Sequence, residues 1–286
     1  MFKTETMITA EELASIQGTP FSPWIVDVRT REDFRAASHW IAGARHCDVA
    51  ALKALGQLDR PTGVVLYCDD SLKSRRAAAV LSDWNGEVRV LERGIAGLIV
   101  PSKTGRSGSQ PIAMVRRRSD LGVDGEHGSR WITREHPKID RVACPWLIRR
   151  FIDPDAEFHY VPTSEVFRVA ADLKATAYDL PGAPITHEWE RCSFDSLLGA
   201  FDLRSPPLDR MATVVRAADT GRPSLAPEAK GLLALSQGLS RLHRLDDHAM
   251  LAAAMPIYDA LYAWACDQKT EPHTWREHEP NAVRAP

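Results

Sequence analysis

Residues 63–84 read GVVLYCDDSLKSRRAAAVLSDW, and this stretch decides how the first third of the chain folds. The run Val64–Tyr67 is β-branched and aromatic, which predicts a short buried strand. Apolar residues then recur at helical spacing up to Trp84, so a helix is predicted to follow almost at once. Cys68 stands between the two, where backbone N–H groups converge and their partial positive charge favours a thiolate. It is therefore the best candidate nucleophile, with an inert thiol at the end of a buried strand as the alternative.

Further strands flank this unit on both sides. Residues 24–29 (WIVDVR) come before it and residues 87–91 (EVRVL) after it, and the first strand is followed by DFRAASHWIAGARH at 33–46. Together with YC-x(4)-K-S at residues 67–74, these blocks resemble a single rhodanese (sulfurtransferase) domain over about the first hundred residues. The resemblance implies an α/β rhodanese-like domain with a central parallel sheet, here at residues 8–100.

The same resemblance assigns roles to individual residues. In rhodanese domains the cysteine takes a sulfane sulfur from a donor as a persulfide and passes it to a thiol acceptor, while the loop after it cups the substrate. The residues that match the catalytic positions are Cys68 as nucleophile, Lys73 and Ser74 at the end of the loop, and Asp27 and Arg29 bracing the first strand. The substrate-binding loop is Asp69, Asp70, Ser71 and Leu72.

The loop departs from the family pattern in its charge. Asp69 and Asp70 stand where a basic or small residue is common, and two carboxylates raise the pKa of a nearby thiol. One like charge at ~5 Å and an effective dielectric near 20 costs on the order of 3 kcal/mol. Lys73 keeps a positive charge but lacks the two-pronged grip of an arginine. Ser74 also excludes the C-x(5)-R pattern of phosphatases, which needs arginine at that position.

Composition limits the remaining classes of function. The 286 residues are enough for two domains, and a net charge of −2 gives no global field that would attract nucleic acid. No stretch approaches ~18 apolar residues and the N-terminus lacks an apolar signal core, so neither a membrane span nor export is expected. Five scattered cysteines without a C-x-x-C pair predict reduced thiols and a cytoplasmic location.

The chain divides where its composition changes. Residues 101–129 are rich in Gly, Ser, Pro and Arg and predict an interdomain linker, with a short ordered piece at residues 112–115. A second domain is predicted at residues 130–268, with helices at 207–219, 226–243 and 246–268. Residues 269–286 hold no apolar periodicity and predict a disordered tail.

Blocks of the second domain also resemble a known family. WITREHPKIDRVACPWLIRRFIDPDAEFHYVP at 131–162, HEWERCSFDSLL at 187–198, VVRAADTG at 214–221 and PIYDALYAW at 256–264 are similar to the C-terminal domain of the chromate-resistance ChrB proteins. The resemblance implies an α-rich α+β domain with a role in chromate resistance, in sensing or regulation. Chromate or another oxyanion is the partner that it implies.

Two side-chain clusters in this domain could bind such ligands. The first has imidazole, carboxylate and thiol groups that suit a divalent ion, Zn or Fe; its members are His187, Glu188, Glu190, Cys192 and Asp219. The second is cationic and suits an oxyanion; its members are Lys138, Arg141, Arg149 and Arg150. Each cluster has a simpler alternative, namely local ion pairs and a solvated helix face.

Two classes of function therefore stay open. The first is a sulfurtransferase that forms a persulfide on Cys68. The second is a non-catalytic regulatory protein that senses a metal ion or an oxyanion in chromate resistance.

Overall fold

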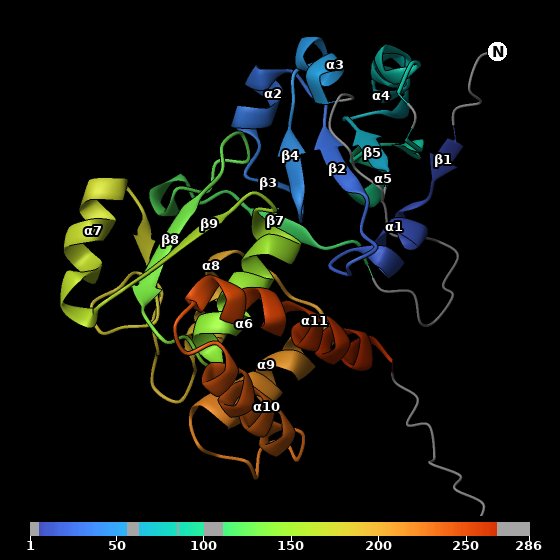
Figure 1. The fold of residues 1–286 in the computed structure, drawn as a ribbon. Coiled ribbons are helices and arrows are strands. Elements are labelled where there is room, and N and C mark those ends of the chain that lie inside the picture. The colour runs from blue at the N-terminus through green and yellow to red at the C-terminus, as the bar shows by residue number, and fades with distance from the viewer. Residues whose placement is uncertain (1–5, 56–62, 85, 100–110, 268–286) are drawn as a thin grey trace, which may run out of the picture.

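A parallel sheet forms the centre of the first half of the chain. The computed structural model describes residues 6–55, 63–84, 86–99 and 111–267 (Figure 1). The sheet has the strand order β1-β6-β5-β2-β4, with all neighbours parallel. Its strands are β1 (Thr6–Ile8), β2 (Trp24–Asp27), β4 (Ala44–His46), β5 (Val64–Tyr67) and β6 (Val88–Leu91). The predicted α/β rhodanese-like class with a central parallel sheet is confirmed.

Short helices with defined N-caps connect these strands. Thr9 and Glu12 form a capping box at the start of α1, and Thr30 caps α2. Asp70 caps α4. The helices of this half are α1 (Ala10–Ile16), α2 (Arg31–Ala36), α3 (Leu52–Leu55), α4 (Ser71–Ala78) and α5 (Ala96–Ile99).

Part of the predicted linker is packed into the fold. β7 (Met114–Arg116) pairs antiparallel with β3 (His39–Ile41), and the side chains of Val115, Leu121 and Val123 are buried. The guanidinium of Arg117 donates to three backbone carbonyls and lies over the Phe34 ring. Residues 111–129 therefore do not act as a loose linker, whereas 101–110 and the predicted tail at 269–286 lie outside the described residues.

The second half contains a smaller parallel sheet covered by helices. β8 (Arg130–Arg134) lies between β10 (Thr176–Ala177) and β9 (Glu157–Val161). α7 packs on one face, and α6 with the later helices lies on the other (Figure 1). These helices are α6 (Asp140–Leu147), the π-helical turn η4 (Ile148–Ile152), α7 (Val166–Leu173), α8 (Ser193–Ala200), α9 (Pro206–Asp219), α10 (Ala229–Leu242) and α11 (Asp247–Cys266). The α-rich α+β prediction for this half is confirmed.

By length and composition alone, α11 could cross a membrane, which the sequence analysis did not anticipate. In the fold, α11 packs against α6, α9 and α10, and it buries Leu251, Tyr258 and Tyr262. Asp259, in the middle of this helix, pairs with Arg150 at 2.8 Å. These contacts make α11 a core helix of the fold described here.

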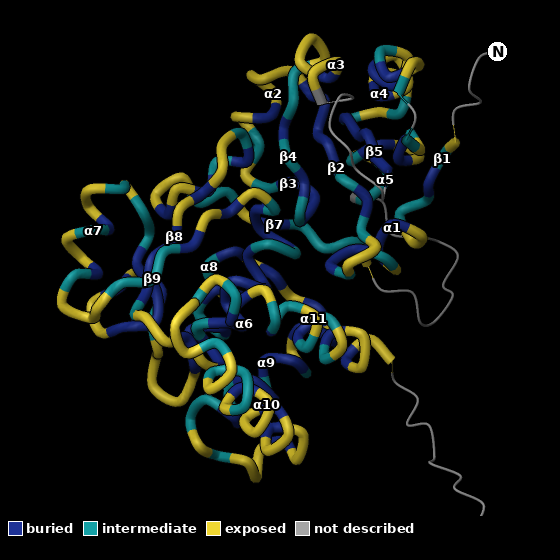
Figure 2. Tube along the Cα trace, viewed as in Figure 1, coloured by how far each residue is buried: buried dark blue, intermediate teal, exposed yellow. Residues whose placement is uncertain are grey.

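The two halves share one core. A single cluster of contacting buried side chains includes Ile25 and Trp40 from the first half and Trp131 from the second, and buried segments (dark blue) occur in both halves in Figure 2. At the junction, Asp153 accepts bonds from the backbone and hydroxyl of Ser129 and pairs with Arg45 at 3.0 Å. The boundaries of the two predicted domains, 8–100 and 130–268, stay a prediction.

Candidate functional site

Cys68 follows β5 directly but is closed off from solvent. Only 1% of the residue is exposed. The carbonyls of Cys68 and Asp69 accept bonds from the amides of Ile95 and Ala96, at 2.9 and 3.2 Å. Gly94 lies against the same two carbonyls with φ +57°, so a side chain at this position would clash with them. Burial raises the pKa of the Cys68 thiol, and the Asp69 carboxylate adds to that rise.

The loop amides that would hold an anion are used by the loop itself. Asp70 Oδ1 accepts from the amides of Leu72 and Lys73, at 2.9 and 3.0 Å. The buried hydroxyl of Ser74 donates back to the carbonyl of Asp70 at 3.2 Å. The loop thus carries its own anion in the position that an anionic substrate would need.

The remaining predicted rhodanese residues form ion pairs. Arg29 makes a two-pronged pair with the buried Asp27, as expected of residues that brace the first strand. Lys73 Nζ lies 3.9 Å from Asp69 Oδ2 at an exposed position. Ser71 is the first residue of α4, and Leu72 is exposed. Asp27 and Arg29 lie at the end of β2, and Ser71, Leu72, Lys73 and Ser74 form the first turn of α4, so their contacts differ from those of an open sulfur-transfer loop.

A hollow of about 190 Å³ lies near the carboxyl ends of β2 and β4. Arg31 and Arg35 line it, but Asp48 and Glu126 pair with them at 2.8 Å. The thiol of Cys47, also at this hollow, has its pKa raised to about 11 by burial. None of the predicted site residues lies here.

The second half brings an imidazole and three carboxylates to one point. His187 Nε2 lies 3.1 Å from Asp219 Oδ2, 3.3 Å from Asp179 Oδ1 and 3.5 Å from Asp140 Oδ2. One donor atom each from Asp140, His187 and Asp219 lies within 4.8 Å of the other two. Asp140 is fully buried, whereas His187 is 41% exposed and opens the cluster to solvent.

Four separate elements position these side chains. Asp140 begins α6, and Asp219 ends α9. Asp179 follows the carboxyl end of β10, and His187 lies in the loop before α8. The carboxyl edge of a parallel sheet is a common place for ligands, because the loops that leave it converge there. Asp140 also accepts from the amides of Ser193 and Phe194 at the start of α8, so that helix fixes its orientation.

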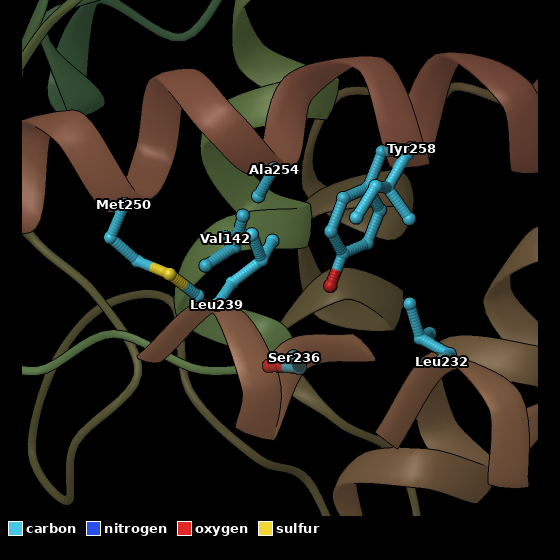
Figure 3. Close-up of a pocket in the computed structure, with 8 residues that line it drawn as sticks. Val142, Leu232, Ser236, Leu239, Met250, Ala254 and Tyr258 are labelled. Carbon is cyan, nitrogen blue, oxygen red and sulfur yellow. The ribbon is translucent and has the colours of Figure 1, made fainter. Parts of the chain in front are cut away.

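Strained backbone supports the cluster. Ile139, the residue before Asp140, has φ 38°, and Asp179 has φ 58°, which side-chain-bearing residues rarely adopt. Both polar groups of Ile139 are held, since its amide donates to Ser236 Oγ at 3.3 Å and the Tyr258 hydroxyl donates to its carbonyl at 2.9 Å. Figure 3 shows Ser236 and Tyr258 at an apolar hollow of about 10 Å³ between α6, α10 and α11. Ser236 and Tyr258, which fix the backbone of Ile139 and so the direction of Asp140, line this hollow. The hollow has room for about one water molecule.

The electrostatics show that the carboxylates of the cluster repel one another. Burial, with Asp140 and Asp179 beside it, raises the pKa of Asp219 to about 7. Burial and Asp140 also raise the pKa of Asp179. A hydrogen bond to Asp140 is the main cause that raises the pKa of His187 to about 9. The carboxylates therefore repel one another, and an added cation would relieve that repulsion.

The donor spacing fits a divalent metal ion. A tetrahedral zinc ion at ~2.0–2.1 Å from each ligand separates neighbouring donors by about 3.3 Å. The separations of 3.1 to 3.5 Å around His187 Nε2 agree with that value. One imidazole with carboxylates suits Zn, Fe or Mn, and Ser193 Oγ, 2.8 Å from Asp179, orients one of the carboxylates. A protonated His187 paired with the carboxylates is the arrangement that a metal ion would replace.

Only two of the five predicted metal ligands, His187 and Asp219, lie in this cluster. Glu188 and Glu190 are exposed on a tight turn, and Glu190 pairs with Arg222 at 3.0 Å. Cys192 is buried as the N-cap of α8, its thiol donates to Asp195, and burial raises its pKa. The sequence analysis missed Asp140 and Asp179, although Asp140 stands out as an acid within an otherwise apolar helix face.

The four predicted oxyanion residues separate in the structure. Arg150 pairs with Asp259, Arg141 lies 3.4 Å from Asp179, and Lys138 is exposed. Arg149 forms no ion pair with any described residue and stacks over Phe158 at 5.0 Å. These side chains therefore do not form one anion site.

Comparisons with known proteins agree with both resemblances. Residues 9–99 match the rhodanese-like domain, and residues 131–265 match the C-terminal domain of ChrB. Protein ChrB of Cupriavidus metallidurans is 40% identical over 136 residues, which are 47% of this chain and 40% of that protein. The chain thus spans about two fifths of the length of this relative. The solved structure of the Alr3790 protein from Anabaena sp. shares 22% identity over 33% of this chain and 79% of its own, with a TM-score of 0.28. Residues 9–99 are therefore similar to rhodanese-like domains, and residues 131–265 are similar to the C-terminal domain of ChrB.

Proposed function

We propose that this chain is a regulatory protein of chromate resistance that binds a divalent metal ion through Asp140, His187 and Asp219. The observation that carries the proposal is the convergence of three donor groups within 4.8 Å in the ChrB-type domain. Asp179 lies beside them and adds a fourth possible ligand. The role in chromate resistance rests on the match of this domain to ChrB.

Sulfur transfer at Cys68 is the second candidate. The match to rhodanese-like domains favours it. Three features of the loop oppose it: the thiol is buried, its pKa is raised, and Asp70 occupies two loop amides. The first half then serves as a packed α/β scaffold for the second. A cytoplasmic location, a sulfane-sulfur donor and a thiol acceptor stay predictions from the sequence.

Metal analysis of the purified full chain tests the proposal. We expect one equivalent of Zn or Fe by elemental mass spectrometry after exposure to either ion, and a loss of most of that metal in His187→Ala and Asp219→Asn. Glu188→Gln is the matched control, because it removes a neighbouring acid that lies outside the cluster. Equal metal content in all four proteins, or none in the unaltered chain, contradicts the proposal.

A second measurement separates the two candidates. Incubation with thiosulfate, followed by native mass spectrometry, reports a sulfur added to Cys68. A persulfide that forms readily on the unaltered chain and is lost in Cys68→Ser would replace the scaffold assignment with sulfur transfer.

A further inference from the structure

Asp179 differs from the other acids of the cluster in the groups that already bind it. Its Oδ2 accepts a hydrogen bond from Arg134 at 3.1 Å and lies 3.4 Å from Nε of Arg141. Its Oδ1 accepts from the hydroxyl of Ser193 at 2.8 Å, and Arg134 also donates to its backbone carbonyl at 2.8 Å. Two guanidinium groups and a hydroxyl therefore hold this carboxylate in place.

Asp140 and Asp219 have no such partners. Within the described residues, neither forms an ion pair with an arginine or a lysine, and the cation beside both is His187. Asp140 accepts from backbone amides of α8, which leave its negative charge unbalanced. Asp179 is the weaker ligand, because two guanidinium groups compete with a metal ion for its oxygens. The three donor atoms that lie within 4.8 Å of one another come from Asp140, His187 and Asp219, without Asp179.

The exposure of these groups shows which side of the ion stays open. Asp140 is fully buried, Asp219 is 20% exposed and His187 is 41% exposed. The cluster is therefore closed at α6 and open at the loop that carries His187. Three ligands fill three corners of a tetrahedral zinc ion, and in catalytic zinc sites a water molecule takes the fourth. Asp179 Oδ1 lies 3.3 Å from His187 Nε2, so this carboxylate borders the ion without being one of the three ligands.

We propose that the metal ion has three protein ligands, Asp140, His187 and Asp219, and keeps a fourth position for an exchangeable water molecule. The inference rests on the metal site proposed above and assigns it to the open, Lewis-acid class of centres. Asp179 is then a positioning residue, which accepts a hydrogen bond from the water and does not touch the ion. The ligands that such a position takes are small donors that displace water, such as azide. Zinc lowers the pKa of a bound water molecule, so the fourth position suits hydrolytic chemistry.

Cobalt(II) in place of zinc makes the coordination visible, because a four-coordinate Co(II) ion absorbs visible light strongly and its bands move when a ligand changes. We expect the full chain to bind one equivalent of Co(II) and to show the bands of a four-coordinate ion. Azide should shift these bands in a saturable way, since it replaces the water and leaves the three protein ligands in place. This measurement uses the unaltered chain, so it does not depend on the folding of any variant.

Asp179→Asn tests the role of Asp179. The variant should still bind one equivalent of Co(II), with an affinity lowered about tenfold to a hundredfold, whereas Asp219→Asn should lose most of the metal. Azide should bind Asp179→Asn about threefold to tenfold more tightly than the unaltered chain, because a negative charge beside the incoming anion is removed. A residue that only supports the fold would not change the azide affinity in this direction. Asp172→Asn is the matched control and should change neither affinity, since Asp172 is an exposed acid that pairs with Arg168 on α7.

Three outcomes would overturn the inference. Co(II) bands that do not respond to azide would place the ion in a closed, structural centre. A loss of metal in Asp179→Asn equal to that in Asp219→Asn would make Asp179 a ligand. Both of these results would leave the proposed metal site standing, whereas a chain that binds no Co(II) would remove the metal site and the inference with it.

Discussion

Replacing Asp219 by Asn should change the stability of the chain in opposite directions with and without a bound metal ion. In the metal-free chain, burial, with Asp140 and Asp179 beside it, raises the pKa of Asp219 from 3.8 to about 7. A carboxyl group whose pKa is higher in the folded state binds a proton that the unfolded chain has already released. The free energy of unfolding therefore falls as the pH rises from about 4 to about 7, and the penalty is complete above pH 7.

The size of the effect follows from the two pKa values. One pKa unit corresponds to about 1.36 kcal/mol, so the penalty at pH 8 is about 4 kcal/mol at most. Asn removes this charge, but it is a weaker hydrogen-bond partner for the neighbouring groups. The weaker bonds cost about 1–2 kcal/mol and so offset part of the gain in stability. We expect Asp219→Asn to be more stable than the unaltered chain by about 1–3 kcal/mol at pH 8 in the presence of a chelator, and the advantage should vanish near pH 4.

A bound metal ion should reverse this order. An ion at a concentration of 1,000 times its dissociation constant stabilises the folded chain by about 4.1 kcal/mol, which exceeds the advantage of Asp219→Asn. The unaltered chain should gain this stability, whereas Asp219→Asn, with one ligand lost, should gain little. Urea unfolding followed by circular dichroism at pH 4 and pH 8, with chelator or with Zn, measures all four differences.

One result would refute the reasoning directly. If Asp219→Asn destabilises the chelated chain at pH 8 by 2 kcal/mol or more, Asp219 stabilises the fold as an ion pair with His187. The cluster would then be a structural network and not a metal site.

Three other substitutions or treatments test the surrounding structure. Asp153→Ala should lower the free energy of unfolding by about 3–5 kcal/mol, because Arg45 loses its closest carboxylate and the buried amide of Ser129 loses its acceptor at the junction of the halves. Asp155→Ala, which removes the longer and more exposed pair with Arg45, should cost less than about 1 kcal/mol in urea unfolding. Tyr258→Phe should lower the free energy of unfolding by about 1–2 kcal/mol and weaken zinc binding in calorimetry, because the carbonyl of Ile139, next to Asp140, loses its hydrogen-bond donor. An unchanged zinc affinity would show that this hydrogen bond does not support the metal site. Iodoacetamide at pH 7.5 should modify the exposed Cys266 before the buried Cys68, as followed by peptide mass spectrometry. Rapid modification of Cys68 would instead favour sulfur transfer at this residue.

The sequence predicted those elements whose pattern is local. The runs at 24–29, 64–67 and 87–91 became β2, β5 and β6, and the predicted helices 207–219, 226–243 and 246–268 correspond to α9, α10 and α11. β7 was predicted only as a short ordered piece at residues 112–115, because the segment around it is polar and rich in glycine and serine. Its single buried residue, Val115, is held by pairing with β3, more than seventy residues earlier, and no local pattern reports such a contact.

The metal cluster was predicted only in part for the same reason. His187 and Asp219 were chosen for their chemistry, and Glu188, Glu190 and Cys192 only for their proximity to His187 in sequence. Proximity fails here because the tight turn at 188–191 carries Glu188 and Glu190 into solvent. Asp140 and Asp179 join the site from the start of α6 and the end of β10, and only the folded arrangement brings them within reach.

The carboxyl edges of the two parallel sheets differ in one respect that decides their chemistry. At the first edge, the loop's own Asp70 occupies the amides of Leu72 and Lys73, and burial together with the Asp69 carboxylate raises the pKa of the Cys68 thiol. At the second edge, Asp140, Asp179 and Asp219 meet His187, while the nearby Arg134 and Arg141 both engage Asp179. The three carboxylates face three cationic groups, yet the raised pKa values of Asp179 and Asp219 show that the carboxylates still repel one another, and a metal ion in place of the His187 proton would relieve that repulsion. The second edge is therefore the one that we propose to bind a ligand: Asp70→Ala should release the amides of Leu72 and Lys73 at the first edge, yet it should leave metal binding unchanged.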